Sequence, residues 1–302
     1  MNSSGAFDRV ALGASGIAVS RLAWGMWRFQ GGDLGRARAL VDAAFDAGIN
    51  LFDTADIYGF NGRDGFGDAE ILLGRLFAAD PGLRRRMVLA SKGGVVPGVP
   101  YDSSADYLVA ACEASLHRLG TDHLDLFQVH RPDVLAHPAE VARALEALVT
   151  SGKVRAVGVS NYSPTQTAAL VAHLRLPLAS IQPEFSPLVL EPLTDGTLDL
   201  AMQHRISVLA WSPLAAGRLG EPGDDERAQR VCAELDRQAQ RCGVSRAAAT
   251  YAWIMAHPGG VVPIVGSQQV NRIREAAAAY QVEWPRADWY RVLVASRGAA
   301  LP

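Results

Sequence analysis

Four polar residues that together could perform acid–base chemistry follow short apolar segments of this 302-residue chain. Asp53 and Tyr58 belong to NLFDTADIYG, Lys92 ends MVLASK, and His130 ends LDLFQVH. A tyrosine has an unperturbed pKa of about 10, which is high for proton donation at neutral pH. A nearby ammonium group stabilises the phenolate and lowers that pKa, so Lys92 would make Tyr58 a general acid. Asp53 would hold Lys92 and keep it charged, and His130 would orient the oxygen that receives the proton.

The lysine content of the chain singles out Lys92. There are 27 arginines but only two lysines, Lys92 and Lys153. A compact ammonium can tune the pKa of a neighbour, whereas the guanidinium of arginine is a fixed, forked charge. A solvated strand end is the simpler interpretation of such a lysine.

The other three residues also have purely structural interpretations. Asp53 could cap the turn that follows it, Tyr58 could be an ordinary loop tyrosine, and His130 could be a hydrogen-bonded core histidine. The joint interpretation gains weight only if all of them lie at the same end of neighbouring strands, because they would then share one site.

Eight short apolar segments recur along the chain, and helical patterns usually separate them. Most lack strict polar alternation, which is typical of strands covered on both faces. The segments are residues 21–25, 50–54, 87–92, 124–130, 154–160, 180–184, 207–212 and 261–266. Eight strand–helix units predict an α/β fold, a (β/α)8 TIM barrel in which chemistry gathers at the carboxyl ends of the strands.

The N-terminal segment and the absence of linkers add to this fold prediction. VALGASGIAVS predicts an N-terminal β-hairpin around residues 13–16 that closes the bottom of the barrel. No linker or low-complexity tract divides the chain, so we expect one domain over residues 1–302. A doubly wound sheet is the alternative, but no GxGxxG follows an early strand.

Capping residues predict the ends of three helices. Ser103 and Asp106 form a variant capping box before the helical pattern of residues 105–120. Ser163 and Gln166 form a second box, and Gly152 ends the helical pattern of EVARALEALVTSG.

Composition excludes several classes of protein. The formal net charge is −2 and no basic patch stands out, so neither nucleic acid nor an anionic membrane is expected as a partner. No uncharged apolar stretch approaches the roughly 18 residues that span a bilayer, and MNSSGAFDRV lacks the pattern of a signal peptide. Cys112, Cys232 and Cys242 have no metal-ligand spacing, so we expect reduced thiols in a cytoplasmic protein without a metal. Nothing in the sequence specifies an oligomeric state.

Motifs along nearly the whole chain resemble those of the aldo-keto reductase superfamily. They are FDTADIYG, SKGG, QVHRPD, SGKVRAVGVSN, IQPEFSPL, AWSPLAAGRL and PIVGSQQVNRIREA. Within the superfamily the chain is most similar to the bacterial YdhF-like branch of oxidoreductases. The resemblance implies a catalytic tetrad of Asp53, Tyr58, Lys92 and His130, with Tyr58 as the proton donor. It also implies a nicotinamide cofactor that lies across the barrel mouth without a Rossmann fold.

The resemblance also implies which residues bind that cofactor. The matching positions are Gly25, Met26, Trp27, Asp53, Ser160, Asn161, Gln182, Trp211, Ser212, Leu214, Gly217, Arg218, Gly266, Ser267, Gln268, Arg272 and Glu275. Ser160, Asn161 and Gln182 match positions that hydrogen-bond the carboxamide, and Trp211 matches the aromatic residue that stacks on the nicotinamide. Residues 214–218 would meet the pyrophosphate, and residues 266–275 would surround the adenosine 2′-phosphate.

Five residues are expected to line the substrate pocket: Trp24, Trp27, Tyr58, His130 and Arg131. The tryptophans would form apolar walls, although tryptophans at a barrel rim often only pack. The Gly-rich loop of residues 59–68 directly follows Tyr58 and is expected either to shape the substrate entrance or to be partly mobile.

The segment from Gly266 also favours a phosphate on physical grounds. Gly266 ends a predicted strand and Ser267 opens a helical pattern, and the free N–H groups at a helix start favour a phosphate. Arg272 could add a bidentate contact, or it could lie on a solvated helix face. Several branches of the superfamily have lysine at the position of Gly266, and often asparagine at that of Ala276. The missing cation weakens the case for a 2′-phosphate. NADP(H) is still favoured over NAD(H), but only by a small margin.

Three functions remain open. The first is reduction of an aldehyde or ketone to an alcohol, with a hydride from NADPH and a proton from Tyr58. The second is the same chemistry in reverse, an NAD(P)-dependent sugar or alcohol dehydrogenase. The third is a cofactor-sensing, non-catalytic subunit, against which the intact tetrad weighs. The substrate could be a small aldehyde, a sugar aldehyde or a quinone-like carbonyl.

Overall fold

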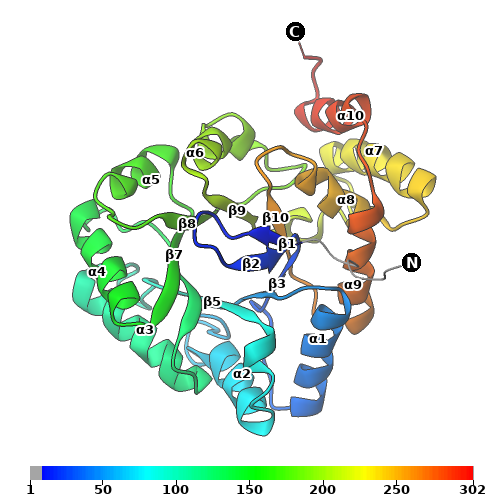
Figure 1. The fold of residues 1–302 in the computed structure, drawn as a ribbon. Helices are drawn as coiled ribbons and strands as arrows, with labels where there is room; N and C mark the ends of the chain where they lie inside the picture. Colours follow the sequence, from blue (N-terminus) through cyan, green and yellow to red (C-terminus); the bar gives the residue numbers. More distant parts are fainter. Residues whose placement is uncertain (1–8, 302) are drawn as a thin grey trace, which may run out of the picture.

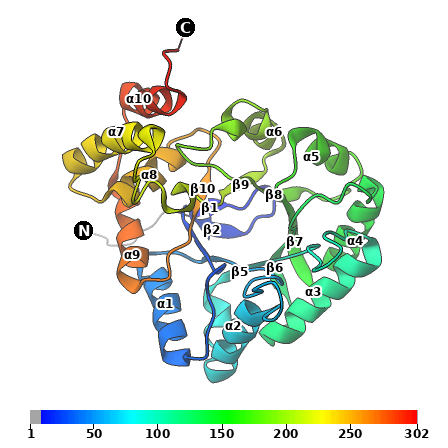
Figure 2. The same cartoon turned by 180° about the vertical axis from the view of Figure 1, so that it is seen from behind.

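The structure is a computed structural model that describes residues 9–301, and its centre is a closed barrel of eight parallel strands surrounded by helices (Figure 1). The strands are hydrogen-bonded in the order β10-β3-β4-β5-β6-β7-β8-β9. This arrangement confirms the (β/α)8 TIM barrel. Seen from behind, the same ring of helices encloses the strands (Figure 2).

All eight predicted apolar segments form barrel strands. The strands are β3 (Ala23–Gly25), β4 (Leu51–Asp53), β5 (Val88–Gly93), β6 (Leu124–Val129), β7 (Val154–Ser160), β8 (Leu178–Gln182), β9 (Ser207–Ala210) and β10 (Val262–Val265). The α-helices are α1 (Leu34–Asp46), α2 (Asp68–Ala79), α3 (Ala105–Leu119), α4 (Pro138–Thr150), α5 (Pro164–Val171), α6 (Thr197–His204), α7 (Glu226–Cys242), α8 (Arg246–Met255), α9 (Val270–Glu275) and α10 (Arg286–Arg297). The short 3-10 helices are η1 (Arg84–Arg86), η2 (Glu191–Leu193), η3 (Ala215–Gly217) and η4 (Ala276–Gln281).

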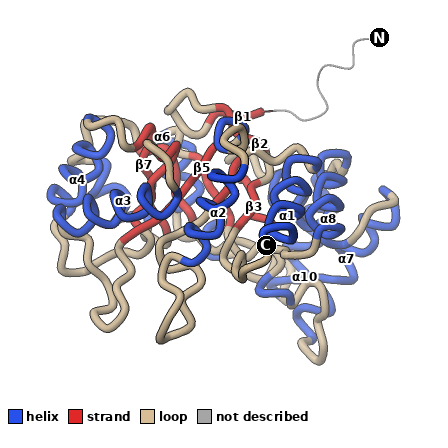
Figure 3. Tube along the Cα trace, turned by 90° about the horizontal axis from the view of Figure 1, so that it is seen from below, coloured by secondary structure: helices blue, strands red, loops and turns tan. Residues whose placement is uncertain are grey.

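The predicted N-terminal hairpin is confirmed. β1 (Arg9–Ala11) pairs antiparallel with β2 (Ala18–Ser20), and the pair lies across one end of the barrel (Figures 1 and 3). Gly13 in its turn has a φ of 55° and donates its N–H to Ser207 Oγ at 2.7 Å. A Cβ at Gly13 would lie 2.4 Å from the carbonyl oxygen of Ala179, so only glycine allows the hairpin to sit this deeply. Figure 3 shows long loops at the opposite end.

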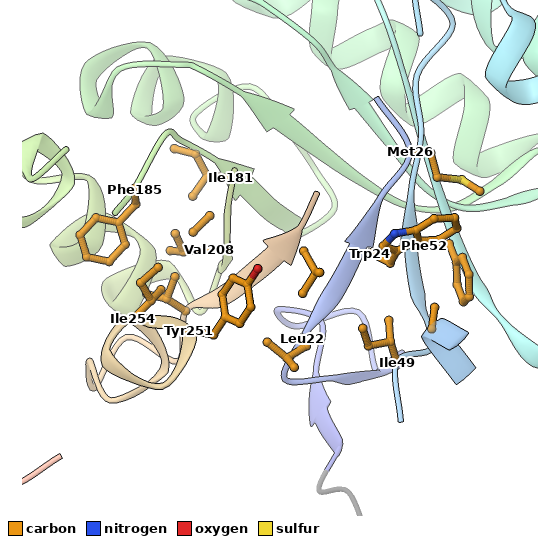
Figure 4. Close-up of a cluster of buried hydrophobic side chains, with 14 of the residues drawn as sticks. Leu22, Trp24, Met26, Ile49, Phe52, Ile181, Phe185, Val208, Tyr251 and Ile254 are labelled. Atoms are coloured by element: carbon orange, nitrogen blue, oxygen red, sulfur yellow. The ribbon is translucent and has the colours of Figure 1, made fainter. Parts of the chain in front are cut away.

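Strand alternation divides the core into two parts. On β4, Leu51 belongs to the apolar cluster inside the barrel, whereas Phe52 belongs to the larger cluster between barrel and helices. Figure 4 shows part of this larger cluster, with Phe52 beside Trp24. Because side chains alternate along a strand, Asp53 has the same inward orientation as Leu51.

Two of the three predicted helix ends are confirmed and one is shifted. Ser163 and Gln166 form the full capping box of α5, and Gly152 adopts a left-handed φ of 74° just after α4. Helix α3, however, is capped by Ser104, whose Oγ accepts from Tyr107 N, and not by Ser103. Ser103 is buried, and its N–H donates to Asp133 Oδ2 at 2.9 Å.

The helix after β10 also begins later than the pattern predicts. Helix α9 starts at Val270 with Gln269 as its N-cap, and it is only six residues long. The hydroxyl of Ser267 accepts from Gln269 N at 3.2 Å in the preceding turn. Ser267 therefore does not open the helix.

Two negative findings apply to residues 9–301. No helix there combines the length and the apolar character that crossing a bilayer requires. The same residues contain no group of three or more His, Cys, Asp and Glu side chains arranged to hold a metal ion.

Candidate active site

The four residues predicted to share a site come together at the carboxyl ends of neighbouring strands. Asp53 is the last residue of β4, Lys92 lies near the end of β5, and His130 follows β6 directly. Tyr58 lies in the loop after β4. That loop is fixed by Asp56 N, which donates to Lys92 O at 3.1 Å, and by Tyr58 O, which accepts from Ala69 N at 3.1 Å.

Lys92 is the centre of this cluster. Its ammonium is fully buried and lies 2.7 Å from Asp53 Oδ2, 2.8 Å from Thr54 O and 3.2 Å from Tyr58 Oη. An ammonium has three donors, so these contacts satisfy all of them. The carbonyl of Thr54 is a partner that no side-chain pattern could have indicated.

The charge of Lys92 is maintained by its neighbours. Burial lowers the pKa of Lys92, but the adjacent Asp53 carboxylate and Tyr58 more than offset this, so the pKa stands above its usual value. The negative charge of Asp53 therefore acts in the direction that keeps Lys92 protonated.

The expected lowering of the Tyr58 pKa is not the net result of its surroundings. Burial raises the pKa of Tyr58, the Lys92 ammonium lowers it, and the Asp53 carboxylate raises it again. The net shift is upward from the usual value of about 10 because removal from water penalises the phenolate more than Lys92 stabilises it. Lys92 thus limits how far the pKa of Tyr58 rises.

His130 completes the cluster as a neutral ring. Its ring centroid lies 5.7 Å from that of Tyr58, in an edge-to-face arrangement. Burial, Lys92 and Arg131 hold the pKa of His130 well below its usual value. Within residues 9–301 its Nδ1 atom is buried without a hydrogen-bond partner. A neutral imidazole of this kind can donate one N–H to a nearby oxygen.

Residues predicted to contact a nicotinamide carboxamide form one connected group beside this cluster. Ser160 Oγ donates to Gln182 O at 3.1 Å, and Asn161 Nδ2 donates to Ser160 Oγ at 2.8 Å. Asn161 Oδ1 accepts from Trp211 Nε1 at 2.9 Å, which fixes the indole ring at the end of β9. Gln182 Nε2 donates to Asp53 Oδ1 at 3.0 Å and so links this group to the cluster around Lys92.

The loop after β9 has an unusual backbone. Ser212, Ala215 and Ala216 have φ values of 53°, 50° and 56°, and Gly217 follows at 97°. Left-handed residues within such a turn direct successive N–H groups toward one side, which is an arrangement that binds anions. The hydroxyl of Ser212 already accepts from Ala216 N at 2.8 Å, so part of this donor set is satisfied internally.

Two further residues of this loop were also assigned to the cofactor. Leu214 is half-buried. Arg218 is exposed, and its guanidinium forms an ion pair with Asp225 Oδ2 at 2.8 Å. Asp225 also caps α7, so the pair fastens the end of the loop to that helix.

The segment after β10 is fastened to the end of β3. Ser267 O accepts from Trp24 Nε1 at 3.0 Å, and Gln268 Nε2 donates to the carbonyl of Gly25 at 3.2 Å. Gln268 Oε1 is buried without a partner among the described residues. Gly266 is exposed, and a Cβ there would meet nothing within 4 Å.

The charged residues of α9 differ in their partners. Arg274 forms an ion pair with Asp46 at 2.8 Å. Arg272 is exposed and has no ion pair or hydrogen bond to any residue in the described range 9–301, and Glu275 is exposed as well.

The structure contradicts the assignment of Trp24 to the substrate pocket. Trp24 is fully buried between barrel and helices, where its ring makes edge-to-face contacts with Phe29 at 5.5 Å and Phe52 at 5.7 Å. Figure 4 shows Trp24 next to Phe52. It is a packing tryptophan, because its parity on β3 directs it outward from the barrel. The side chain of Met26 is buried in the same cluster and offers no surface to a cofactor.

Two other residues assigned to the substrate pocket do have accessible surface. Trp27 is 67% exposed. The guanidinium of Arg131 is 5.9 Å from the ring centroid of Trp211 and has no hydrogen bond or ion pair within residues 9–301.

A second group of buried ionisable residues lies behind β5 and was not anticipated. Ser91 points out of the barrel and donates to Glu70 Oε1, and Arg118 Nε donates to Glu70 Oε2 at 2.7 Å. Nearby, both carboxyl oxygens of Asp56 are buried without a hydrogen-bond partner in the part of the chain that the structure describes. Burial and the charge of Glu70 raise the pKa of Asp56 to about 8.

The fold and the sequence define the class of protein. A crystal structure of a thermostable aldo-keto reductase with the inhibitor epalrestat superimposes with a TM-score of 0.81 at 24% identity, covering 95% of this chain and 99% of that one. This similarity shows the shared fold. The sequence model of the Aldo/keto reductase family matches residues 21–293. The protein therefore belongs to the aldo/keto reductase family and is an oxidoreductase.

Individual members of the family show which of its proteins are most similar in sequence among those compared. The chain is 57% identical over 293 residues to 6-dehydroglucose reductase of Novosphingobium aromaticivorans, with 96% of each chain covered. It is 37% identical to 6-dehydroglucose reductase of Agrobacterium fabrum, covering 96% of this chain and 98% of the relative. It is 36% identical to oxidoreductase YdhF of Escherichia coli, covering 98% and 99%. The similarity to YdhF confirms the predicted branch.

Proposed function

We propose that this protein reduces the aldehyde of a hexose, 6-dehydroglucose or a close analogue, to a primary alcohol, with NADPH as the hydride donor and Tyr58 as the proton donor. The observation that carries the proposal is the hydrogen-bonded chain Asp53–Lys92–Tyr58 at the open end of the barrel. A half-buried phenol in contact with a fully buried ammonium is arranged to deliver a proton to an oxygen and to bear the negative charge that remains.

The residues around this acid fit a nicotinamide dinucleotide. Trp211 is held by Asn161 at one edge, the loop after β9 has left-handed residues that favour an anion, and Gln268 keeps a buried acceptor without a partner among residues 9–301. When bound, such a cofactor supplies the hydride that reduces a carbonyl carbon. Ser160, Asn161 and Gln182 would hold its carboxamide.

The protein's own residues would then complete the reduction. Tyr58 donates its hydroxyl proton to the carbonyl oxygen as that oxygen becomes negative. Lys92 stabilises the resulting phenolate and is itself held by Asp53. His130, which is neutral, donates an N–H to the same oxygen and fixes its position.

Preference for NADP(H) over NAD(H) is proposed on the basis of Arg272. Its guanidinium is exposed and lacks a carboxylate partner within residues 9–301, so it is free to bind a 2′-phosphate. Gly266 contributes no cation, which leaves Arg272 as the main charged contact and keeps the preference modest.

The proposal of a hexose aldehyde rests on the relatives. Two reductases that share 57% and 37% of their residues with this chain are named for 6-dehydroglucose. The exposed ring of Trp27 suits a sugar because it offers an apolar face. The guanidinium of Arg131, which has no hydrogen bond or ion pair to any residue from 9 to 301, offers donors to hydroxyl groups.

A substrate panel tests the activity. We expect oxidation of NADPH with 6-dehydroglucose to exceed that with small aldehydes and quinones, and reduction of NADP with glucose to be slower. Faster alcohol oxidation would favour the dehydrogenase. Failure to oxidise NADPH in a single turnover with any carbonyl would favour a cofactor sensor.

The Tyr58→Phe variant tests the proton donor. We expect kcat to fall by roughly 10² to 10⁴-fold because the general acid is lost, whereas NADPH affinity, measured by fluorescence, stays near that of the wild type. The matched control is Tyr290→Phe on α10, which should leave both quantities unchanged. Wild-type turnover in Tyr58→Phe would refute the assignment.

A further inference from the structure

The second oxygen of the Asp53 carboxylate faces two glutamine amides inside the barrel. Its Oδ2 binds Lys92, whereas Oδ1 accepts from Gln182 Nε2 at 3.0 Å and from Gln128 Nε2 at 3.4 Å. Gln182 belongs to β8 and was assigned to the carboxamide. Gln128 belongs to β6 and has no role in the proposed reaction.

The orientation of Gln128 is fixed by a serine. Ser180 Oγ donates to Gln128 Oε1 at 3.1 Å, so the amide nitrogen is the end that remains for Asp53. Gly158 on the intervening strand β7 makes this contact possible. A Cβ at Gly158 would lie 2.0 Å from Ser180 Oγ and 3.2 Å from Gln128 Cγ.

This amide arrangement lies in a dry environment. Gln128 and Ser180 are fully buried, and the neighbouring cluster inside the barrel is apolar, with Leu51, Leu126 and Leu209 among its members. A buried carboxylate requires protein donors because water does not reach it. The donors of Gln128 and Gln182 therefore influence how much negative charge Asp53 presents to Lys92.

We propose that Gln128, held by Ser180, is a positioning residue that fixes Asp53 and limits the negative charge acting on Lys92 and Tyr58. The proposal rests on the proposed role of Tyr58 as the acid. The Asp53 charge raises the pKa values of both Lys92 and Tyr58, so a donor that takes up part of this charge keeps the phenol a stronger acid.

Other ionisable groups also face the Lys92–Tyr58 pair. They are Asp53 and Asp56 on the side of β4, and His130 and Arg131 on the side of β6. A substitution of Gln128 removes none of these groups, so a shift in the pH profile would report the loss of the amide donor to Asp53.

The test is the pH profile of kcat/KM for reduction by Gln128→Met, which keeps the length of the side chain and removes its donor. Because Tyr58 must be protonated, kcat/KM falls at alkaline pH. We expect the midpoint of this fall to move upward by about 0.5 to 1 pH unit in the variant, the size expected from one weak hydrogen bond to a charged group. We also expect kcat to fall several-fold with little change in KM.

Two further variants separate this role from simple structural support. Gln238→Met removes an equally buried glutamine of α7, far from Asp53 in the chain, and should lower stability without moving the midpoint. Ser180→Ala releases the Gln128 amide and should move the midpoint in the same direction by a smaller amount. If Gln128→Met does not fold, the midpoint measured for Ser180→Ala tests the proposal by itself. An unmoved midpoint in every folded variant overturns the proposal.

A readout without turnover separates this proposal from the proposed function. Lys92 and Lys153 are the only lysines, so ¹³Cε-lysine labelling gives two NMR signals that Lys153→Arg assigns. In the cofactor-free Gln128→Met protein we expect Lys92 to remain an ammonium to higher pH than in wild type, while Lys153 is unchanged. Identical Lys92 titrations overturn the positioning role. Absence of carbonyl reduction by the wild type refutes only the proposed function.

Discussion

At the scale of single residues, Lys92 occupies a position that only an ammonium fits. Its three donors have three acceptors, at 2.7, 2.8 and 3.2 Å, in a fully buried site. A guanidinium is larger and planar and carries five donors, so it would leave some of them unsatisfied here. This explains why a chain that uses arginine almost everywhere has a lysine at this strand end.

Lys92→Arg should therefore be nearly inactive although the charge is kept. We expect kcat/KM to fall by roughly 10²-fold or more because the larger guanidinium group displaces Tyr58 or Asp53. The other lysine provides a matched control, since Lys153 is partly exposed and its ammonium forms an ion pair with Glu113 on the surface. Steady-state kinetics of Lys92→Arg and Lys153→Arg check this, and equal activities would show that the ammonium has no special role.

The neutral state of His130 leads to a pH prediction at the same scale. Because the pKa of His130 lies well below its usual value, the ring stays neutral through the mildly acidic range. We expect kcat/KM for reduction to be flat from about pH 6 to 8, with no inflection near the ordinary histidine pKa of about 6.5. An inflection there that disappears in His130→Gln would show that the ring titrates during catalysis.

At the scale of elements, the sequence predicts the positions of the strands, but it predicts only in part which face of a strand each side chain occupies. All eight apolar segments became barrel strands because buried parallel strands are continuously apolar. Gln128 has a signal that could have been used: it lies two residues before His130 and therefore on the same face of its strand. Trp24 shows where prediction of side-chain direction from the sequence fails. Its strand has three residues, too few for alternation to reveal which face is inward. Ser103 and Ser104 are adjacent candidates for one cap, and tertiary contact with Asp133 decides between them.

Gly158 tests how tightly β6, β7 and β8 are packed. In Gly158→Ala the new methyl group would lie 2.0 Å from Ser180 Oγ and 2.9 Å from Ser180 O. The backbone oxygen cannot rotate away, so we expect a loss of about 2 to 3 kcal/mol in the free energy of unfolding. Denaturant unfolding of Gly158→Ala and Gly32→Ala checks this, because a Cβ at Gly32 would meet nothing within 4 Å. Equal stability of the two variants would contradict the close approach.

At the scale of the whole molecule, ionisable groups are buried on both sides of β5. Lys92 points into the barrel, and Ser91 points outward to Glu70 and Arg118. Asp56 lies near both groups, with a pKa raised to about 8 by burial first and by Glu70 second. The loop that carries Tyr58 thus also carries a carboxylic acid whose pKa burial raises far above its ordinary value.

Asp56 should make the stability of the protein depend on pH. In the unfolded chain Asp56 loses its proton near its ordinary pKa of about 4, whereas in the folded protein it keeps the proton up to about pH 8. Between these values the unfolded state binds fewer protons, so the Asp56 contribution lowers the free energy of unfolding as pH rises and levels off above about pH 8. Asp56→Asn removes this pH-dependent contribution, and the stability of the variant relative to wild type should increase between pH 5 and pH 8 by roughly 2 to 4 kcal/mol.

Urea unfolding of wild type and Asp56→Asn at several pH values measures this difference in the free energy of unfolding. The control is Asp64→Asn at an exposed loop position, whose free energy of unfolding should change with pH in the same way as that of wild type. A constant difference between Asp56→Asn and wild type would mean that Asp56 ionises in the folded protein at the same pH as in the unfolded chain.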